Sequence, residues 1–403
     1  KMDSLKELFK IGNGPSSSHT IGPERAAKKF KERTPNTEKY VVELYGSLAL
    51  TGKGHLTDWI ITETLKPAET KIVWMPEVVY DYHTNGMKFK ALDNDGNVTE
   101  EWVVFSVGGG TIMELDQERR GPSKIYPYSK MDDIKKWCEE GKKEYWEYVV
   151  EHEGEEIFIF LKEIWDAMAT AVERGIEKTG VLPGTLKLSR RAQGFYRKAR
   201  NNHGRGGFLG RIFAYTLAVS EENGAGGRVV TAPTCGASGI IPGLLYALRE
   251  EYDISEKELL KGLAIAGLIG NIVKENATIS GAEGGCQAEV GTACAMAAGM
   301  ACFLLGGSLD QIEYASEMAL EHHLGLTCDP VGGYVQIPCI ERNAAASARA
   351  LDSAAYSLYT DGKHTISFDQ VVITMGETGK DLKSEYKETS LGGLAKFRFN
   401  AEC

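Results

Sequence analysis

The sequence predicts an α+β N-terminal domain followed by a larger all-α domain. In the first third of the 403 residues, several short runs rich in Val, Tyr, Phe and Ile are bounded by turn residues, a pattern typical of β-strands. Beyond about Asp132, apolar residues recur at helical spacing and β-branched runs become rare. A chain of this length also favours two domains over a single small core.

The N-terminal domain is expected to hold four strands and two helices. Asn94 to Asn97 lies between the last two strands, and its Gly and Asn residues tolerate the positive φ of a hairpin turn. The expected strands are Tyr40–Tyr45, Lys71–Tyr80, Gly86–Leu92 and Val98–Val107, and the expected helices are Glu24–Phe30, after Pro23, and His55–Leu65, after Gly54.

The second domain is expected to be built from helices alone. They are Ile157–Lys178, Gly207–Glu222, Ile240–Glu251, Glu256–Glu275, Gln287–Leu305, Leu309–Leu324, Glu341–Tyr359 and Phe368–Lys380. The charged segment Ser123–Tyr148 is expected to be a linker or a peripheral helix. The predicted division is therefore a domain of residues 1–130, a linker of residues 131–150, and a domain of residues 151–403 that ends in a tail.

Charge and hydropathy exclude two classes of partner. The formal net charge of −10 argues against nucleic acid, because phosphate recognition needs a basic surface. The basic stretch Lys187–Arg205 is expected to be a solvated or oligomer-facing helix. Val290–Gly307 is long enough to span a membrane, but it consists mostly of Ala, Gly, Cys and Met and lacks flanking Lys or Arg anchors. We expect it to be a buried helix.

Cysteine usage indicates a reducing compartment. Eight cysteines in a long chain, with no apolar region at the N-terminus, do not fit a secreted disulfide framework. The expected location is the cytoplasm, where free thiols and metal clusters persist.

Four of the cysteines are candidate metal ligands. Cys286, Cys328 and Cys339 are each flanked by Gly, Pro or Asp at an element boundary. Cys403 is the last residue, and a chain end can place a thiolate in a pocket and withdraw it again. Four thiolates suit an iron–sulfur cluster or a closed zinc site, although this spacing matches no compact C-x-x-C motif. Cys294 and Cys302, among Ala and Met, are interpreted as small buried hydrophobic residues.

The densest motif runs from Ile11 to Pro23. It combines glycines with three hydroxyls and an imidazole directly before a predicted helix, where backbone N–H groups favour a carboxylate or a phosphate. A Ser-rich cap and turn is the structural alternative. The candidate binding residues are Ser16, Ser17, Ser18, His19 and Thr20.

Two further segments carry candidate catalytic groups. The segment around Lys53 and His55 is glycine-rich but lacks the phosphate-loop pattern, so nucleotide binding is not expected, and these residues are candidates for a cation and a base. His83 and Asn85 can act as a base and an amide donor on one loop, or they can be ordinary turn residues.

The chain resembles the bacterial-type iron–sulfur-dependent L-serine dehydratases (L-serine ammonia-lyases) that carry both domains on one chain. The resemblance covers nearly the whole sequence and rests on the motifs GPSSSHTIGP, GSLALTGKGH, HTNGM, SVGGG, GRVVTAPT, SGAEGGCQAEVG, HHLGLTCDPVGGYVQIPCIERNA and YKETSLGGLA, and on the final cysteine. It implies that the helical domain is the catalytic domain and that the first domain resembles an allosteric-substrate-binding domain. The segment between His55 and His83 is shorter than in some relatives, which bears on contacts between the domains.

The resemblance also implies residue roles. Cys286, Cys328 and Cys339 match the three cysteines that hold a [4Fe–4S] cluster, and Cys403 matches the cysteine that occupies the fourth iron at rest. Residues 16–20 match the substrate-side loop, and Lys53, His55, His83 and Asn85 match polar positions brought to the cluster.

The implied reaction converts L-serine to pyruvate and ammonia without pyridoxal phosphate. Of the two candidate bases, His55 is preferred to His83. The alternatives are a cluster-dependent lyase of L-cysteine or L-threonine, a serine-sensing or electron-transfer iron–sulfur protein, and a structural zinc protein. A homodimer is expected, because dimers are the commonest assembly.

Overall fold

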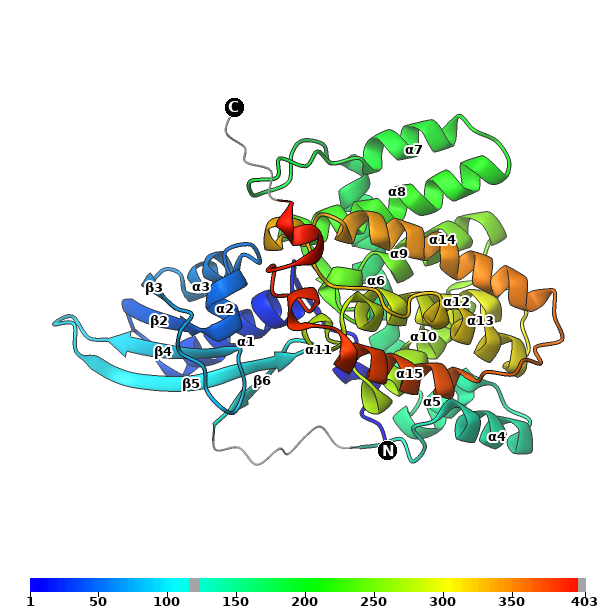
Figure 1. Ribbon diagram of the computed structural model, residues 1–403, viewed down its shortest axis with the longest axis horizontal. Coiled ribbons are helices and arrows are strands. Elements are labelled where there is room, and N and C mark those ends of the chain that lie inside the picture. The colour runs from blue at the N-terminus through cyan, green and yellow to red at the C-terminus, as the bar shows by residue number, and fades with distance from the viewer. Residues whose placement is uncertain (116–123, 398–403) are drawn as a thin grey trace.

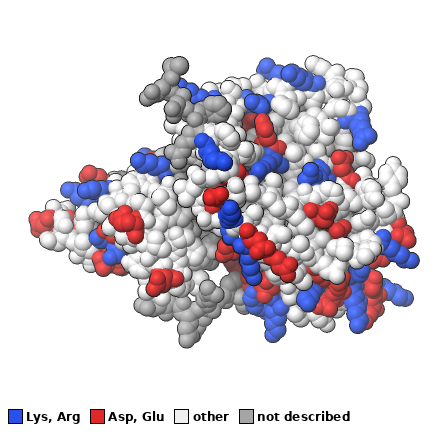
Figure 2. All heavy atoms as spheres, viewed as in Figure 1, with Lys and Arg blue, Asp and Glu red and all other residues white. Residues whose placement is uncertain are grey.

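The computed structural model describes residues 1–115 and 124–397. An α+β domain and a larger helical domain lie side by side, which confirms the predicted fold class (Figure 1). Figure 2 shows Lys and Arg side chains intermingled with Asp and Glu over this face of the helical domain.

The α+β domain is built on a five-stranded sheet with the order β3-β2-β4-β5-β6. The strands are β2 (Lys39–Tyr45), β3 (Glu69–Met75), β4 (Gly86–Leu92), β5 (Val98–Gly108) and β6 (Thr111–Glu114). Strands β2 and β3 are parallel and the other pairs are antiparallel. The predicted hairpin is present, since Asp93 N–H donates to the Asn97 carbonyl at 2.9 Å and Gly96 has a φ of 84°.

One predicted strand of this domain ends earlier than expected, and one predicted helix begins later. Strand β3 stops at Met75 because Pro76 has no N–H to donate to a neighbouring strand. The predicted helix over 55–65 begins only at Thr57, because Leu56 has a left-handed φ of 57°. A short helix that was not predicted, α2 (Gly46–Thr51), precedes it.

Two helices, α1 (Gly22–Arg33) and α3 (Thr57–Leu65), bury one face of the sheet. Phe30 of α1 and Ile61 of α3 are fully buried in one apolar cluster with Val42, Phe89 and Val104 of the strands. This packing fixes the start of α1, and with it the serine-rich segment just before α1.

The first residues of the chain belong to the packing of the helical domain. Met2, Leu5 and Phe9 are buried in the main core of that domain. Strand β1 (Ile11–Asn13) pairs antiparallel with β7 (Arg228–Val230), so that Ile11 lies opposite Val230. The serine-rich segment that follows is therefore held at the boundary between the domains.

The eight predicted helices are present, with ends that differ by a few residues. They are α6 (Ile157–Glu177), α8 (Arg205–Gly224), α9 (Ile240–Tyr252), α10 (Glu256–Asn276), the π-helix η4 (Gln287–Gly291) continued by α12 (Thr292–Leu304), α13 (Leu309–Glu321), α14 (Cys339–Leu358) and α15 (Phe368–Asp381). Four more are α4 (Met131–Gly141), α5 (Tyr145–Glu153), α7 (Ala192–Arg200) and the short α11 (Gly281–Gly284).

The structure shows where the long apolar segment and the charged segment before the helical domain lie. Gln287–Leu304 is apolar and long enough to cross a membrane, but 83% of it is buried inside the molecule, where α12 contacts α9, α10, α13 and α14. The segment expected as a linker or peripheral helix forms α4 and α5, and Tyr145 and Tyr148 of α5 are fully buried in the helical core.

The segment after α15 runs along the boundary between the domains (Figure 1, red). It is attached to the loop that carries Cys328, because Glu388 N–H donates to the Cys328 carbonyl at 2.7 Å. Leu394 N–H donates to Oδ2 of Asp329 at 2.6 Å on the same loop. Residues distant in the sequence thus meet at one place.

Candidate active site

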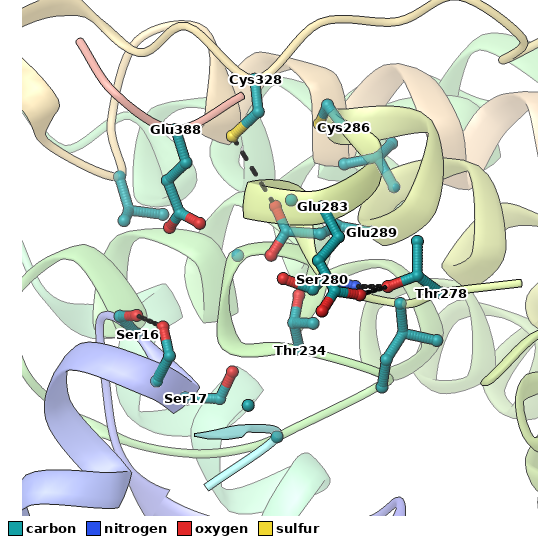
Figure 3. A pocket seen from close by; sticks show the side chains of 18 of the residues that line it. Ser16, Ser17, Thr234, Thr278, Ser280, Glu283, Cys286, Glu289, Cys328 and Glu388 are labelled. Carbon is teal, nitrogen blue, oxygen red and sulfur yellow. Dashed lines mark hydrogen bonds between the residues drawn. The ribbon is translucent and has the colours of Figure 1, made fainter. Parts of the chain in front are cut away.

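A cavity of about 320 Å³ lies where the two domains meet. The α+β side contributes Ser16, Ser17, Ser18 and His55, and the helical side contributes three cysteines and several carboxylates. Figure 3 shows Cys286 and Cys328 on one side, Ser16 and Ser17 on the opposite side, and Glu289 and Glu388 between them.

The three predicted cysteines within the described residues all line this cavity. Cys286 precedes η4, Cys328 lies on the loop between α13 and α14, and Cys339 is the first residue of α14. Burial raises the pKa of Cys286 to about 11 and raises the pKa of Cys328 and Cys339 as well. Neighbouring cysteine side chains raise the pKa of Cys328 and that of Cys339 further. The three sulfurs therefore share one cavity, where a bound cation would stabilise their thiolates.

The remaining predicted ligand, Cys403, lies outside the described residues. Within residues 1–115 and 124–397, no group of three or more His, Cys, Asp or Glu side chains is arranged to hold a single metal ion. Cys294 and Cys302 are fully buried in α12, as their apolar surroundings predict.

The serine-rich segment forms the π-helix η2 (Ser17–Ile21), which continues directly into α1. Ser16 caps it, since its Oγ accepts a hydrogen bond of 3.1 Å from His19 N–H. Ser16 is therefore a cap, as the structural alternative predicts, and Ser16, Ser17 and Ser18 also line the cavity, where anion binding stays a prediction.

His19 and Thr20 hold the segment in place and do not line the cavity. The two ring nitrogens of His19 lie 2.7 Å from the Ser18 hydroxyl and 3.2 Å from the Ser47 hydroxyl. The Thr20 hydroxyl donates to the His55 carbonyl at 2.7 Å. Burial lowers the pKa of His19 well below its usual value, so the imidazole is neutral.

His55 is the imidazole that faces the cavity. Its side chain is almost completely buried, and neither ring nitrogen makes a hydrogen bond to any described residue. Burial lowers its pKa to about 4, so that it is a neutral base at physiological pH. An unpartnered buried imidazole is costly unless a ligand engages it.

The other three predicted polar residues lie near the cavity or away from it, but do not line it. Lys53 is exposed, and its Nζ lies 5.5 Å from the centre of the Trp74 ring. Nδ1 of His83 accepts a hydrogen bond of 3.0 Å from Asn85 N–H. Burial lowers the pKa of His83, and the carboxylate of Glu283, which lines the cavity, offsets part of this decrease.

Among the carboxylates that line the cavity and that sequence reasoning did not assign to a site are those of Glu289 and Glu388. Burial raises the pKa of Glu289 to about 7 and that of Glu388 to about 8. Glu289 follows Cys286 by three residues, which is one helical turn, and this spacing could have revealed it. Glu388 lies in a segment without regular structure, and no local pattern marks it.

Comparison with known proteins identifies the family. Residues 60–395 match the family model of the serine dehydratase alpha chain, and residues 4–73 match that of the serine dehydratase beta chain. The chain is 42% identical to an L-serine dehydratase of Streptomyces coelicolor, over 97% of this chain and 98% of the relative. It is 40% identical to L-serine dehydratase 2 of Escherichia coli, over 98% of each chain, and 38% identical to an L-serine dehydratase of Helicobacter pylori, again over 98% of each.

These alignments extend over 447 to 449 positions, more than the 403 residues of this chain, so the relatives contain insertions relative to it. The similarity nevertheless spans both domains and every segment that lines the cavity within the described residues. The chain belongs to the serine dehydratase family.

Proposed function

We propose that this protein is an L-serine ammonia-lyase that converts L-serine to pyruvate and ammonia with the help of a [4Fe–4S] cluster. The observation that carries the proposal is the meeting of three buried cysteines, a serine-rich helix start and an unpartnered imidazole in one cavity. The names of the relatives support the substrate, and the match to both chains of serine dehydratase supports the reaction class.

The cysteines suit a [4Fe–4S] cluster, in which each thiolate holds a different iron. All three of the described candidate ligands line one cavity. Cys286, Cys328 and Cys339 would hold three irons. When bound, the cluster supplies a Lewis acid that eases departure of the substrate hydroxyl.

The serine-rich segment is suited to the substrate carboxylate. The first amides of a helix have no intrahelical acceptor and carry partial positive charge, which favours an anion. The hydroxyls of Ser16, Ser17 and Ser18 add donors on the same wall of the cavity. His19 and Thr20 keep this arrangement rigid through their hydrogen bonds to Ser18, Ser47 and the His55 carbonyl.

His55 is the proposed general base. It is neutral, it lines the cavity, and its ring nitrogens are available to accept the α-proton of the substrate. His83 is the second candidate, since Glu283 at the cavity wall influences its pKa. Loss of the α-proton and the β-hydroxyl leaves 2-aminoacrylate and water. The aminoacrylate tautomerises to an imine, and water hydrolyses this imine to pyruvate and ammonia.

Three parts of the proposal rest on the sequence and on general arguments. We propose Cys403 as the ligand that occupies the fourth iron at rest and leaves when substrate binds. We propose a reducing cytoplasmic location, in keeping with seven free thiols among the described cysteines. We propose a homodimer, which light scattering of the purified protein would test.

The test is pyruvate release by protein that has been reconstituted with iron and sulfide in the absence of oxygen. We expect release from L-serine that disappears after exposure to air. L-Threonine, which carries an added methyl group, should react about 10- to 200-fold less efficiently. Faster reaction of L-threonine or L-cysteine would show that this amino acid, and not L-serine, is the preferred substrate. Brown, cluster-loaded protein that turns over none of the three amino acids would contradict the lyase function.

A further inference from the structure

The cavity contains two carboxylates that no cation of the described residues compensates. Glu289 and Glu388 line it from different segments, and no Lys, Arg or His of residues 1–115 and 124–397 lies within ion-pair distance of either. The two basic residues of the cavity wall are engaged elsewhere. Lys274 lies 3.6 Å from Oδ2 of Asp3, and Arg342 donates to the Thr327 carbonyl at 2.6 Å.

The local structure makes room for the Glu289 carboxylate. A Cβ atom at Gly281 would lie 2.7 Å from Oε2 of Glu289, and one at Gly236 would lie 3.5 Å from the same carboxylate. Any side chain at Gly281 would therefore displace this carboxylate. In Figure 3, Glu289 and Glu388 extend into the same space between the cysteines and the serines.

Glu388 is held in an unfavourable backbone conformation. Its φ of 59° lies in the left-handed region, which costs a non-glycine residue about 1 kcal/mol or more. The hydrogen bond from its N–H to the Cys328 carbonyl, at 2.7 Å, keeps it on the loop that carries this cysteine. Strain at a position that directs a side chain into a cavity indicates a functional role.

A second, independent polar group points to a ligand in the same cavity. His55 is 1% exposed, and neither nitrogen of its ring has a hydrogen-bond partner among the described residues. Buried polar groups are rarely left without a partner, so a molecule with donors and acceptors of its own would satisfy them.

We infer that Glu289 and Glu388 bind the α-ammonium group of the substrate and restrict the enzyme to amino acids. This assignment rests on the proposed function. The carboxylate of the amino acid would lie against Ser16 and Ser17, its ammonium between the two glutamates, and its side-chain hydroxyl toward the cysteines. A 2-hydroxy acid carries a neutral hydroxyl in place of the ammonium, and it would leave both carboxylates unpaired.

The experiment compares two ligands that cannot react. L-Alanine and L-lactate differ only in the ammonium or hydroxyl at the α-carbon, and neither has a leaving group at the β-carbon. Equilibrium dialysis with labelled ligand, on anaerobic cluster-loaded protein, gives both affinities without turnover. We expect L-alanine to bind at least about tenfold more tightly, equivalent to about 1.4 kcal/mol. Equal affinities, or no detectable binding of either ligand, would overturn the assignment.

The variants Glu289→Gln and Glu388→Gln each remove a carboxylate that the ammonium would pair with, and they keep the shape of the side chain. Each should reduce the preference for L-alanine about tenfold and raise KM for L-serine, and a preference retained in both contradicts the assignment. Glu283→Gln is the matched control. Glu283 lines the same cavity but accepts a hydrogen bond of 2.6 Å from Thr278, so its variant should keep the preference.

Failure of this assignment can be distinguished from failure of the proposed function. Wild-type protein that releases pyruvate from L-serine but does not discriminate between L-alanine and L-lactate overturns only the ammonium site. Protein that prefers L-alanine but releases no pyruvate from L-serine supports the ammonium site and overturns the serine lyase. The wild-type comparison needs no variant, so it decides the question even if a variant fails to fold.

Discussion

The imidazole rings of His19 and His55 lie 4.7 Å apart, centre to centre, but only the ring of His19 has hydrogen-bond partners among the described residues. Ser18 and Ser47 engage both nitrogens of His19, whereas no described residue engages either nitrogen of His55. Two histidines that sequence analysis assigned to one site therefore differ in what they can do. His19 stabilises the serine-rich segment, and His55 can accept a proton from a molecule in the cavity.

The first prediction concerns His55 as the base. His55→Gln should lower kcat for L-serine by about 10²- to 10⁴-fold, the usual contribution of a general base. The iron content should not change, because His55 is not a proposed ligand. Steady-state pyruvate release measures the effect, with His83→Gln as the comparison. A larger loss in His83→Gln than in His55→Gln would transfer the role of base to His83.

The second prediction concerns the dependence of stability on pH. Burial lowers the pKa of His55 from about 6.5 in the unfolded chain to about 4, so the unfolded chain binds more protons between these pH values. Stability should therefore fall as the pH falls from 6.5 to 4, and His55 alone contributes about 3 kcal/mol to this loss. Calorimetry should show a Tm that decreases less steeply in His55→Gln. Equal slopes would mean that His55 does not titrate as described.

Local sequence patterns predicted most of the fold, because they reflect local physics. The strand over Gly86–Leu92 and the turn at Asn94–Asn97 each depend on a few adjacent residues, and both are present. The composition of Val290–Gly307, rich in Ala, Gly, Cys and Met, correctly predicted a buried helix for the same reason. The core role of Met2 and Phe9 was not predictable, because the residues that cover them come from the other domain.

The candidate site was predicted in part. The three cysteines and the serine-rich segment were recognisable because each carries a local signature, of flanking Gly and Pro or of clustered hydroxyls. Glu388 was not, since its segment reaches the cavity through contacts with the distant Cys328 loop, which no local pattern reveals. Lys53, two residues from His55, was grouped with it, but the intervening turn directs Lys53 toward Trp74 instead.

The third prediction separates ligand cysteines from structural ones. Cys286→Ser, Cys328→Ser and Cys339→Ser should each lose most of the bound iron and sulfide, because a serine hydroxyl is a much poorer iron ligand than a thiolate. Metal analysis and the visible absorption of anaerobically reconstituted protein measure this. Cys302 is buried in α12, and the variant Cys302→Ala should retain the full content of iron and sulfide. Full iron content in all three serine variants would rule out the proposed ligand set.

The fourth prediction concerns Cys403. A thiolate that occupies the fourth iron must leave before substrate binds, so turnover should begin with a lag after L-serine is added. Cys403→Ala should shorten this lag and make the cluster more sensitive to air. Rapid-mixing measurements of pyruvate formation test the first effect, and loss of visible absorption in air tests the second. An unchanged lag in Cys403→Ala excludes this residue as its cause.

The fifth prediction separates binding from helix capping within the serine-rich segment. Ser16 and Ser17 both line the cavity, but only the Ser16 hydroxyl accepts the capping hydrogen bond from His19 N–H. Ser16→Ala should lower stability by about 1 kcal/mol and raise KM, whereas Ser17→Ala should raise KM with little change in Tm. Kinetics with L-serine and thermal unfolding of the same preparations distinguish the two effects. If Ser17→Ala leaves KM unchanged, the hydroxyl of Ser17 does not contact the substrate, and carboxylate binding falls to Ser16, Ser18 and the helix amides.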